Sequence, residues 1–188
     1  MSNEIFVWPE PIRIGDAARF TPSSPLIRQL SADETARKRI AKALGLLALD
    51  QLDAELALSG WFDGLQIEGR WRARVTQACV LTLEPFPADL AGDFRLRLVP
   101  VGSPHAMIVE EEEIEVDLEA DDPPDIVESD LVDLGAYVVE HLALEIDPFP
   151  RKPDAVFEPP QPTAEISPFA ALRDWKRPAP SGDGPEET

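Results

Sequence analysis

Apolar and polar residues alternate along four stretches of the chain, and this period of two predicts β-strands. The stretches cover residues 52–58, 65–75, 94–98 and 114–118. In each stretch one side of the strand is apolar and the other carries charged side chains. One-sided alternation is typical of an antiparallel sheet with one face on the core and the other in water. Residues 61–64 read Trp-Phe-Asp-Gly and predict a tight turn, because Asp-Gly readily adopts positive φ.

Two further segments have the spacing of amphipathic helices. The first opens at Ser31, where a glutamate three residues later completes a capping box, and it ends near Gly45. Its predicted buried stripe comprises Ile40, Ala43, Leu44 and Leu47. The second helix covers residues 131–144, with Asp130 or Asp133 near its start and prolines after its end. Its predicted buried stripe comprises Leu131, Leu134, Val138 and Leu142.

These elements predict one α+β domain over residues 1–152, built on an antiparallel sheet that can curl towards a barrel, with two main helices. Between the last strand and the second helix, residues 120–130 are acidic and contain two prolines, which favours a solvated connector.

Residues 153–188 form a proline-rich tail that is expected to be largely disordered, because ten of the 20 prolines lie in 148–188. One part of the tail, near residues 168–176, predicts a short amphipathic helix. Its apolar face comprises Phe169, Leu172 and Trp175. That face either docks a partner or packs back on the domain.

Charge divides the chain into two unlike halves. The formal net charge is −19. Residues 1–78 balance ten basic against ten acidic side chains, whereas residues 79–188 carry seven basic and 26 acidic ones. An acidic surface repels nucleic acid and attracts basic proteins. Any contact with RNA is therefore expected from the first half.

Arginines alternate along two of the predicted strands and form the first candidate binding surface. They are Arg70, Arg72 and Arg74 on one strand and Arg95 and Arg97 on another. On neighbouring strands they would share one sheet face and could bind RNA phosphates or unpaired bases. Pairing with acidic strands at 53–55 and 113–119 is the favoured alternative, because it would neutralise this face. A second basic candidate lies on the first helix and comprises Arg37, Lys38 and Lys42.

The residues that usually carry catalysis or hold metals are sparse. Cys79 is the one cysteine, so neither an internal disulfide nor a multi-cysteine zinc site is available, and a small buried side chain is expected. His105 and His141 have no ligand or triad spacing. Residues 110–113 are four glutamates and predict a solvated face. No enzyme activity and no cofactor are expected.

No apolar stretch approaches the ~18 residues that span a bilayer, and the N-terminus lacks a signal peptide. We therefore expect a soluble, cytoplasmic protein with no membrane partner.

Several motifs, in this order, resemble the YceD-like family of large ribosomal RNA subunit accumulation proteins. Residues 129–151 contain Asp-Leu-Gly-x-x-Val-x-Glu-x-Leu-x-Leu before a Pro-x-Pro exit. Upstream, the family's Cys-x-x-Cys is represented by Cys79 and Thr82, as in alphaproteobacterial-type members, and is followed by Leu-Glu-Pro-Phe. Residues 168–172 resemble the Pro-Phe-Ala-x-Leu element near the end of many members.

The resemblance implies a non-enzymatic role in accumulation of 23S ribosomal RNA and assembly of the large ribosomal subunit. The implied partners are precursor rRNA and a basic ribosomal protein such as L32, and not DNA. The candidate partner-binding residues are Glu110, Glu111, Glu112, Glu113, Asp121, Asp122, Phe169, Leu172 and Trp175. The alternative is an acidic protein-interaction adaptor that uses the tail helix and has no RNA role.

Overall fold

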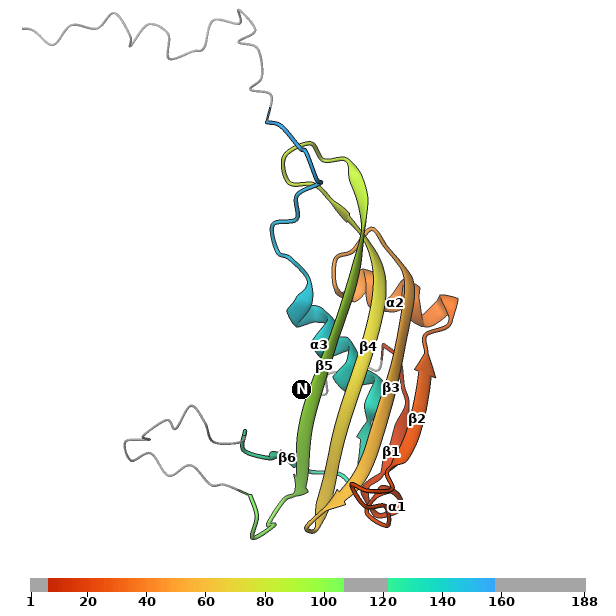
Figure 1. The fold of residues 1–188 in the computed structure, drawn as a ribbon, viewed down its shortest axis with the longest axis vertical. Coiled ribbons are helices and arrows are strands. Elements are labelled where there is room, and N and C mark those ends of the chain that lie inside the picture. The colour runs from red at the N-terminus through yellow and green to blue at the C-terminus, as the bar shows by residue number, and fades with distance from the viewer. Residues whose placement is uncertain (1–6, 107–121, 158–188) are drawn as a thin grey trace, which may run out of the picture. The chain divides into compact units, whose positions relative to one another are not determined.

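Five strands form the central sheet of the computed structural model, which describes residues 7–106 and 122–157. In spatial order they are β2 (Leu26–Ser31), β3 (Ala48–Trp61), β4 (Gly64–Ala78), β5 (Pro85–Pro100) and β6 (Asp125–Val127). Each of the first four strands is antiparallel to its neighbour, and β6 is parallel to β5 (Figure 1). The sheet is open, since its edge strands β2 and β6 do not pair with each other. The predicted α+β class and antiparallel sheet are confirmed, and the sheet does not close into a barrel.

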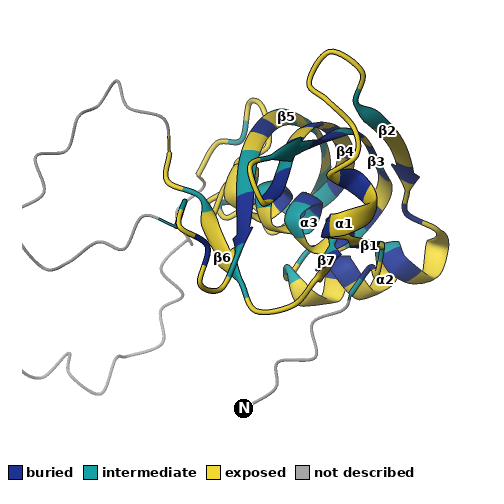
Figure 2. Cartoon of the chain, turned by 90° about the horizontal axis from the view of Figure 1, so that it is seen from below, coloured by how far each residue is buried: buried dark blue, intermediate teal, exposed yellow. Residues whose placement is uncertain are grey.

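Short strands and three helices cover the concave side of the sheet. The strands β1 (Pro11–Arg13) and β7 (Leu131–Asp133) pair with each other. The helices are α1 (Ile14–Ala17), α2 (Glu34–Ala43) and α3 (Leu134–Glu145). Seen from one end, the sheet curls around α3 (Figure 2). No helix among the described residues is long and apolar enough to cross a membrane.

The core lies between the concave face of the sheet and the helices. The apolar positions predicted from alternation are buried there: Leu52, Ala54, Leu56, Leu58, Ile67, Trp71, Ala73, Val75, Phe94 and Leu98. From α3, Leu134, Val138 and Leu142 join the same cluster. Burial of each large aliphatic side chain contributes about 1.5–3 kcal/mol, so this continuous cluster dominates the stability of the domain. The predicted faces of three strands are therefore confirmed.

The first long helix begins later than the capping box predicted. Ser31 is the last residue of β2, and its hydroxyl donates to Asp53 at 2.7 Å instead of capping a helix. The N-cap is Asp33, whose carboxylate accepts the N–H of Ala36 at 2.7 Å. Ile40 is buried as predicted, together with Ala36 and Ala41.

The predicted positions of Ala43 and Leu47 in the buried stripe are wrong, because both are exposed. Gly45 ends the helix with a φ of +68°, so Leu47 no longer follows the helical spacing.

The second long helix begins at Leu134 and not at residue 131, because residues 131–133 form β7 against β1. Leu131 is consequently 53% exposed, and its predicted place in the buried stripe is wrong. The predicted connector at 120–130 is also partly wrong, since it contains β6. The predicted strand at 114–118 and the tail helix lie outside the described residues.

The tight turn between β3 and β4 is present, but its chemistry differs from the prediction. The residue with positive φ is Phe62, at +51°. Gly64 is required for a different reason: a Cβ there would lie 1.9 Å from the carbonyl oxygen of Leu98. Glycine therefore permits the close approach of β4 to β5 at this end of the sheet.

The described elements belong to one compact unit, which ends at Val156. The division of the chain at residue 152 stays a prediction.

Candidate functional site

The five arginines of the first candidate surface lie on adjacent strands and on the convex, solvent-facing side of the sheet. Arg70, Arg72 and Arg74 project from β4, and Arg95 and Arg97 project from β5. The two strands pair along their length, so the expectation that these arginines share one face is correct. We call this surface the arginine face. Whether it binds RNA stays a prediction.

Carboxylates are interleaved with the arginines on the same face. Arg74 makes two hydrogen bonds to Asp89, at 2.7 and 3.2 Å. These bonds lower the pKa of Asp89, so this carboxylate keeps its charge in moderately acidic solution.

Two more arginines have acidic neighbours. Arg95 lies 3.2 Å from Glu68, and Arg72 lies 3.7 Å from Asp53. The pKa of Asp53 is lowered mainly by hydrogen bonds from the side chains of Gln51 and Ser31, and further by the charge of Arg72. Such exposed pairs add only about 0–1 kcal/mol each, but they cancel the charge presented to a ligand.

The alternative of cross-strand pairing is therefore what the structure shows for three arginines. Of the acidic positions named in advance, Asp53 takes part, while residues 113–119 lie outside the described chain. Asp89 and Glu68 were not foreseen, because their roles depend on the register between β4 and β5.

The remaining two arginines have different surroundings. Arg70 stands opposite Glu55 on β3 and Asp93 on β5, yet forms no ion pair within the part of the chain that the structure describes. The guanidinium of Arg97 lies 5.3 Å from the ring centre of Trp61. This arginine belongs to an aromatic cluster at the β3–β4 turn, which the sequence pattern did not reveal.

The aromatic cluster explains the unusual turn residue. Phe62 stacks on His105 with ring centres 3.8 Å apart and packs edge-on against Trp61. A bulky residue at positive φ is strained by about 1–3 kcal/mol, and the stacking offsets part of that strain.

Counted by charge, the arginine face is balanced. Its five arginines are matched by five carboxylates in register on the same side: Asp53, Glu55, Glu68, Asp89 and Asp93. A groove of about 870 Å³ crosses this face from β3 to β5 and is bounded by residues 122–125. Its charged lining residues are Glu55, Glu68, Asp93, Asp122, Asp125, Arg70, Arg95 and Arg97, five acidic against three basic. The groove therefore carries a formal charge of −2.

The basic residues of α2 are not brought together with the arginine face. The buried residues of α2 join the core on the concave side of the sheet, whereas the arginines lie at exposed or half-buried positions of β4 and β5 on the opposite face. Lys38 pairs with Glu34 at 2.6 Å, and Arg37 donates to the carbonyl oxygen of Ala32 at 2.7 Å. Lys42 is exposed near the end of the helix. The two predicted basic surfaces are separate.

Of the predicted acidic and apolar partner-binding residues, the structure describes one. Asp122 is exposed and lines the groove. Glu110, Glu111, Glu112, Glu113, Asp121, Phe169, Leu172 and Trp175 lie outside the described residues.

Cys79 is fully buried, as expected for a lone cysteine, but its surroundings are polar. Hydrogen bonds from the backbone of Lys152 and the side chain of Thr82 lower the pKa of the Cys79 thiol to about 7. Within the described residues no cluster of three or more His, Cys, Asp or Glu side chains could hold a metal ion.

His141 packs against the core and not against a catalytic partner. It stacks on Phe94 at 4.1 Å, and burial lowers its pKa. With His105 in the aromatic cluster, both histidines have a structural contact.

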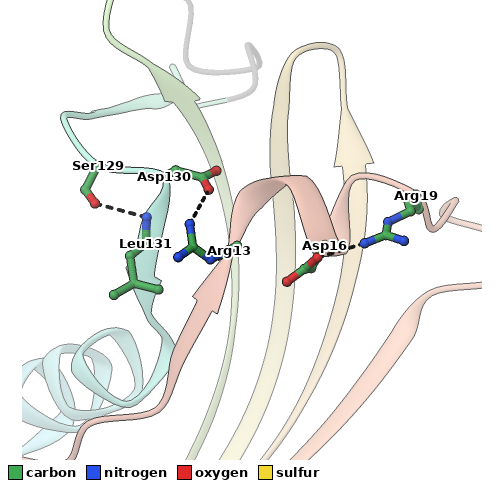
Figure 3. A network of polar contacts seen from close by, with 6 residues as sticks. All are labelled: Arg13, Asp16, Arg19, Ser129, Asp130 and Leu131. Carbon is green, nitrogen blue, oxygen red and sulfur yellow. Dashed lines mark hydrogen bonds and ion pairs between the residues drawn. The ribbon is translucent and has the colours of Figure 1, made fainter.

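The segment at 129–151 has a structural role that its residues explain. Figure 3 shows the junction where β7 meets β1: the guanidinium of Arg13 lies 3.5 Å from Asp130, and Ser129 accepts the N–H of Leu131 at 3.0 Å. Asp133 then caps α3. A Cβ at Gly135 would lie 1.9 Å from the carbonyl oxygen of Trp8. Only glycine at this position therefore leaves room for the backbone of the N-terminal segment.

Comparison with known proteins gives one match. The model of a family described as the large ribosomal RNA subunit accumulation protein YceD matches residues 67–175, which are 109 of the 188 residues. Neither the curated proteins nor the solved structures include a significant match.

Proposed function

The chain belongs to the YceD family of large ribosomal RNA subunit accumulation proteins, and from this premise we propose that it is a non-enzymatic assembly factor that binds a basic ribosomal protein. Membership places its role in the accumulation of large-subunit ribosomal RNA. The partner and the binding surface are the proposed part. Ribosomal protein L32, implied by the family resemblance, is the first candidate to test.

The charge balance of the arginine face is the observation that favours a protein, and not RNA, as the binding partner. Affinity for nucleic acid comes mainly from cations that neutralise phosphates. Here Arg72, Arg74 and Arg95 have carboxylate partners at 2.7–3.7 Å, and the groove that crosses this face has an excess of acid. With a net charge of −19 for the chain, the field favours the approach of a polycation.

Depletion of the protein in its host tests the role in assembly. We expect the ratio of 23S to 16S rRNA to fall and incomplete large subunits to accumulate, as measured by gel quantification and sucrose gradients. Complementation with the full chain should restore both. An unchanged ratio after verified depletion would refute the assembly role.

Two matched sets of variants then separate the two kinds of partner. The acidic set is Asp93→Asn, Asp122→Asn and Asp125→Asn, and the basic set is Arg70→Gln, Arg72→Gln and Arg95→Gln. We expect the acidic set to weaken binding of purified L32 and to fail in complementation, while the basic set complements. Loss of complementation by the basic set alone, with weaker binding of 23S rRNA, would overturn the protein partner in favour of RNA.

A further inference from the structure

The outer edge of β5 is open along most of its length. β5 runs from Pro85 to Pro100, but β6 pairs only with Leu98–Pro100 (Figure 1). Between Pro85 and Arg97, no described residue pairs with the side of β5 that faces away from β4. An unpaired strand edge presents backbone N–H and C=O groups that can template another strand.

The register identifies which groups face this edge. Val101, the residue after the end of β5, donates its N–H to the carbonyl oxygen of Val127 in β6, so its N–H points away from β4. Backbone groups alternate sides along a strand, which means that odd-numbered residues of β5 direct their N–H and C=O outward. In the open part these are Asp89, Ala91, Asp93, Arg95 and Arg97. Pro87 also falls in this series, where its missing N–H breaks no bond to β4.

The side chains beside the edge define what could lie there. On the solvent-facing side, the open stretch from Pro85 to Arg97 carries two acidic and two basic residues. Asp89 is paired with Arg74 and Arg95 with Glu68, whereas Asp93 has no ion pair among the described residues. On the other side, Ala88 and Leu90 are half-buried and pack against the core. A strand added at about 5 Å would place alternate side chains next to the carboxylates and next to these apolar residues.

We propose that the open edge of β5 binds an extended, basic segment of a partner protein by strand addition. The segment would alternate Lys or Arg with apolar residues, the former facing Asp93 and the carboxylates of the bordering groove and the latter facing Ala88 and Leu90. The groove that borders this edge, with its formal charge of −2, extends the attraction for a cationic chain. The identity of the partner as a ribosomal protein rests on the proposed function, whereas the mode of binding does not.

Proline, one of the devices that protect an exposed edge, is confined to the ends of this one. Proline blocks strand addition, and it is present at positions 85, 87 and 100. Between them, residues 88–99 contain neither proline nor lysine. The opposite edge of the sheet, β2, is only six residues long. The longer edge, which borders the acidic groove, is thus the better fit for an added strand.

Ala91→Pro is the direct test, because it removes one outward N–H and changes no charge. Ala91→Val keeps the N–H and serves as the matched control. The probe is a labelled peptide of about twelve residues, the length of a long strand, with alternating lysine and valine. Its control is the same peptide with alternate backbone nitrogens methylated. We expect Ala91→Pro to weaken binding about tenfold in fluorescence anisotropy, the effect of one or two backbone hydrogen bonds, and Ala91→Val to leave it within about twofold.

Amide hydrogen exchange on the unaltered full chain provides a measurement that does not depend on the folding of a variant. The amides of Asp89, Ala91 and Asp93 should exchange quickly in the free protein and slowly once the peptide is bound. Equal binding by Ala91→Pro and Ala91→Val, or by the two peptides, would show diffuse electrostatic attraction and overturn the proposal.

Three other results would also overturn it: no binding of the peptide, slow exchange at these amides before peptide is added, or a self-association that Ala91→Pro abolishes. The last two would mean that residues 107–121 of the same chain, or a second copy, occupy the edge. If depletion left 23S rRNA unchanged while the peptide still bound as expected, the proposed function would fail and strand addition would stand.

Discussion

Replacement of Asp133 by alanine should destabilise the domain more than any other single change to a surface-accessible carboxylate of the described chain. Its Oδ1 atom accepts two backbone N–H groups, from Gly135 at 3.1 Å and from Glu10 at 2.8 Å. The first bond caps α3, and the second ties the segment before β1 to the helix across 123 positions of sequence. Alanine removes the shared acceptor and therefore both hydrogen bonds at once.

The size of the effect follows from these two bonds. Loss of an N-cap carboxylate typically costs about 1 kcal/mol. A half-buried backbone N–H left without an acceptor, here that of Glu10, adds about 1–2 kcal/mol. The sum of about 2–3 kcal/mol corresponds to a fall in Tm of roughly 5–10 °C for a domain of this size.

Circular dichroism during thermal and urea unfolding measures this loss, and two variants calibrate it. Asp133→Asn keeps an oxygen acceptor for the two N–H groups and should lower stability by less than Asp133→Ala does. Asp130→Ala breaks only the exposed ion pair with Arg13, in which both side chains are more than half exposed, and should change stability by less than about 1 kcal/mol. If Asp133→Ala and Asp130→Ala were equally stable, the role assigned to Asp133 would be wrong.

Three further predictions concern single residues. Burial raises the pKa of Tyr137, the one tyrosine, to about 12, so absorbance at alkaline pH should show no ionisation near pH 10 until urea unfolds the protein, and stability should fall as pH rises above 10. The thiolate absorbance of Cys79 should titrate near pH 7, and Thr82→Val, which removes a hydrogen-bond donor, should raise that midpoint; an unmoved midpoint would contradict the assigned cause. Leu83 has a φ of +59° and is 78% exposed, so Leu83→Asn should raise the free energy of unfolding by up to about 1 kcal/mol, and a loss would show that Leu83 makes a stabilising contact.

The strands and their buried faces could be predicted from the sequence because alternation is a local signal. Leu56, Ile67 and Val75 are fully buried where a period of two placed them. The burial of each side chain follows from its neighbours in the sequence and from one requirement, that one side of the strand faces the core.

The starts of both long helices could not be predicted, because distant residues compete for the same backbone. Residues 131–133 have helical spacing but pair with Pro11–Arg13, about 120 positions earlier. Ser31 has the chemistry of an N-cap, yet its hydroxyl is taken by Asp53 on the next strand. The state of the arginines was hidden for the same reason, since the partnership of Arg74 with Asp89 exists only in the observed register of β4 and β5.

The extent of the family match bears on which surface carries the function. The match begins at residue 67 and so includes most of β4, all of β5 and β6, and the bounding residues of the groove. It excludes α2, whose basic residues formed the second candidate. Within the matched range, residues 129–145 are committed to the junction with β1 and to the core through Asp133, Gly135 and the buried side of α3. A function shared across the family needs a surface that lies inside the matched residues and whose side chains are not already engaged in structural contacts. The open edge of β5 and the part of the groove lined by β4, β5 and residues 122–125 meet both conditions, whereas the basic face of α2 does not meet the first.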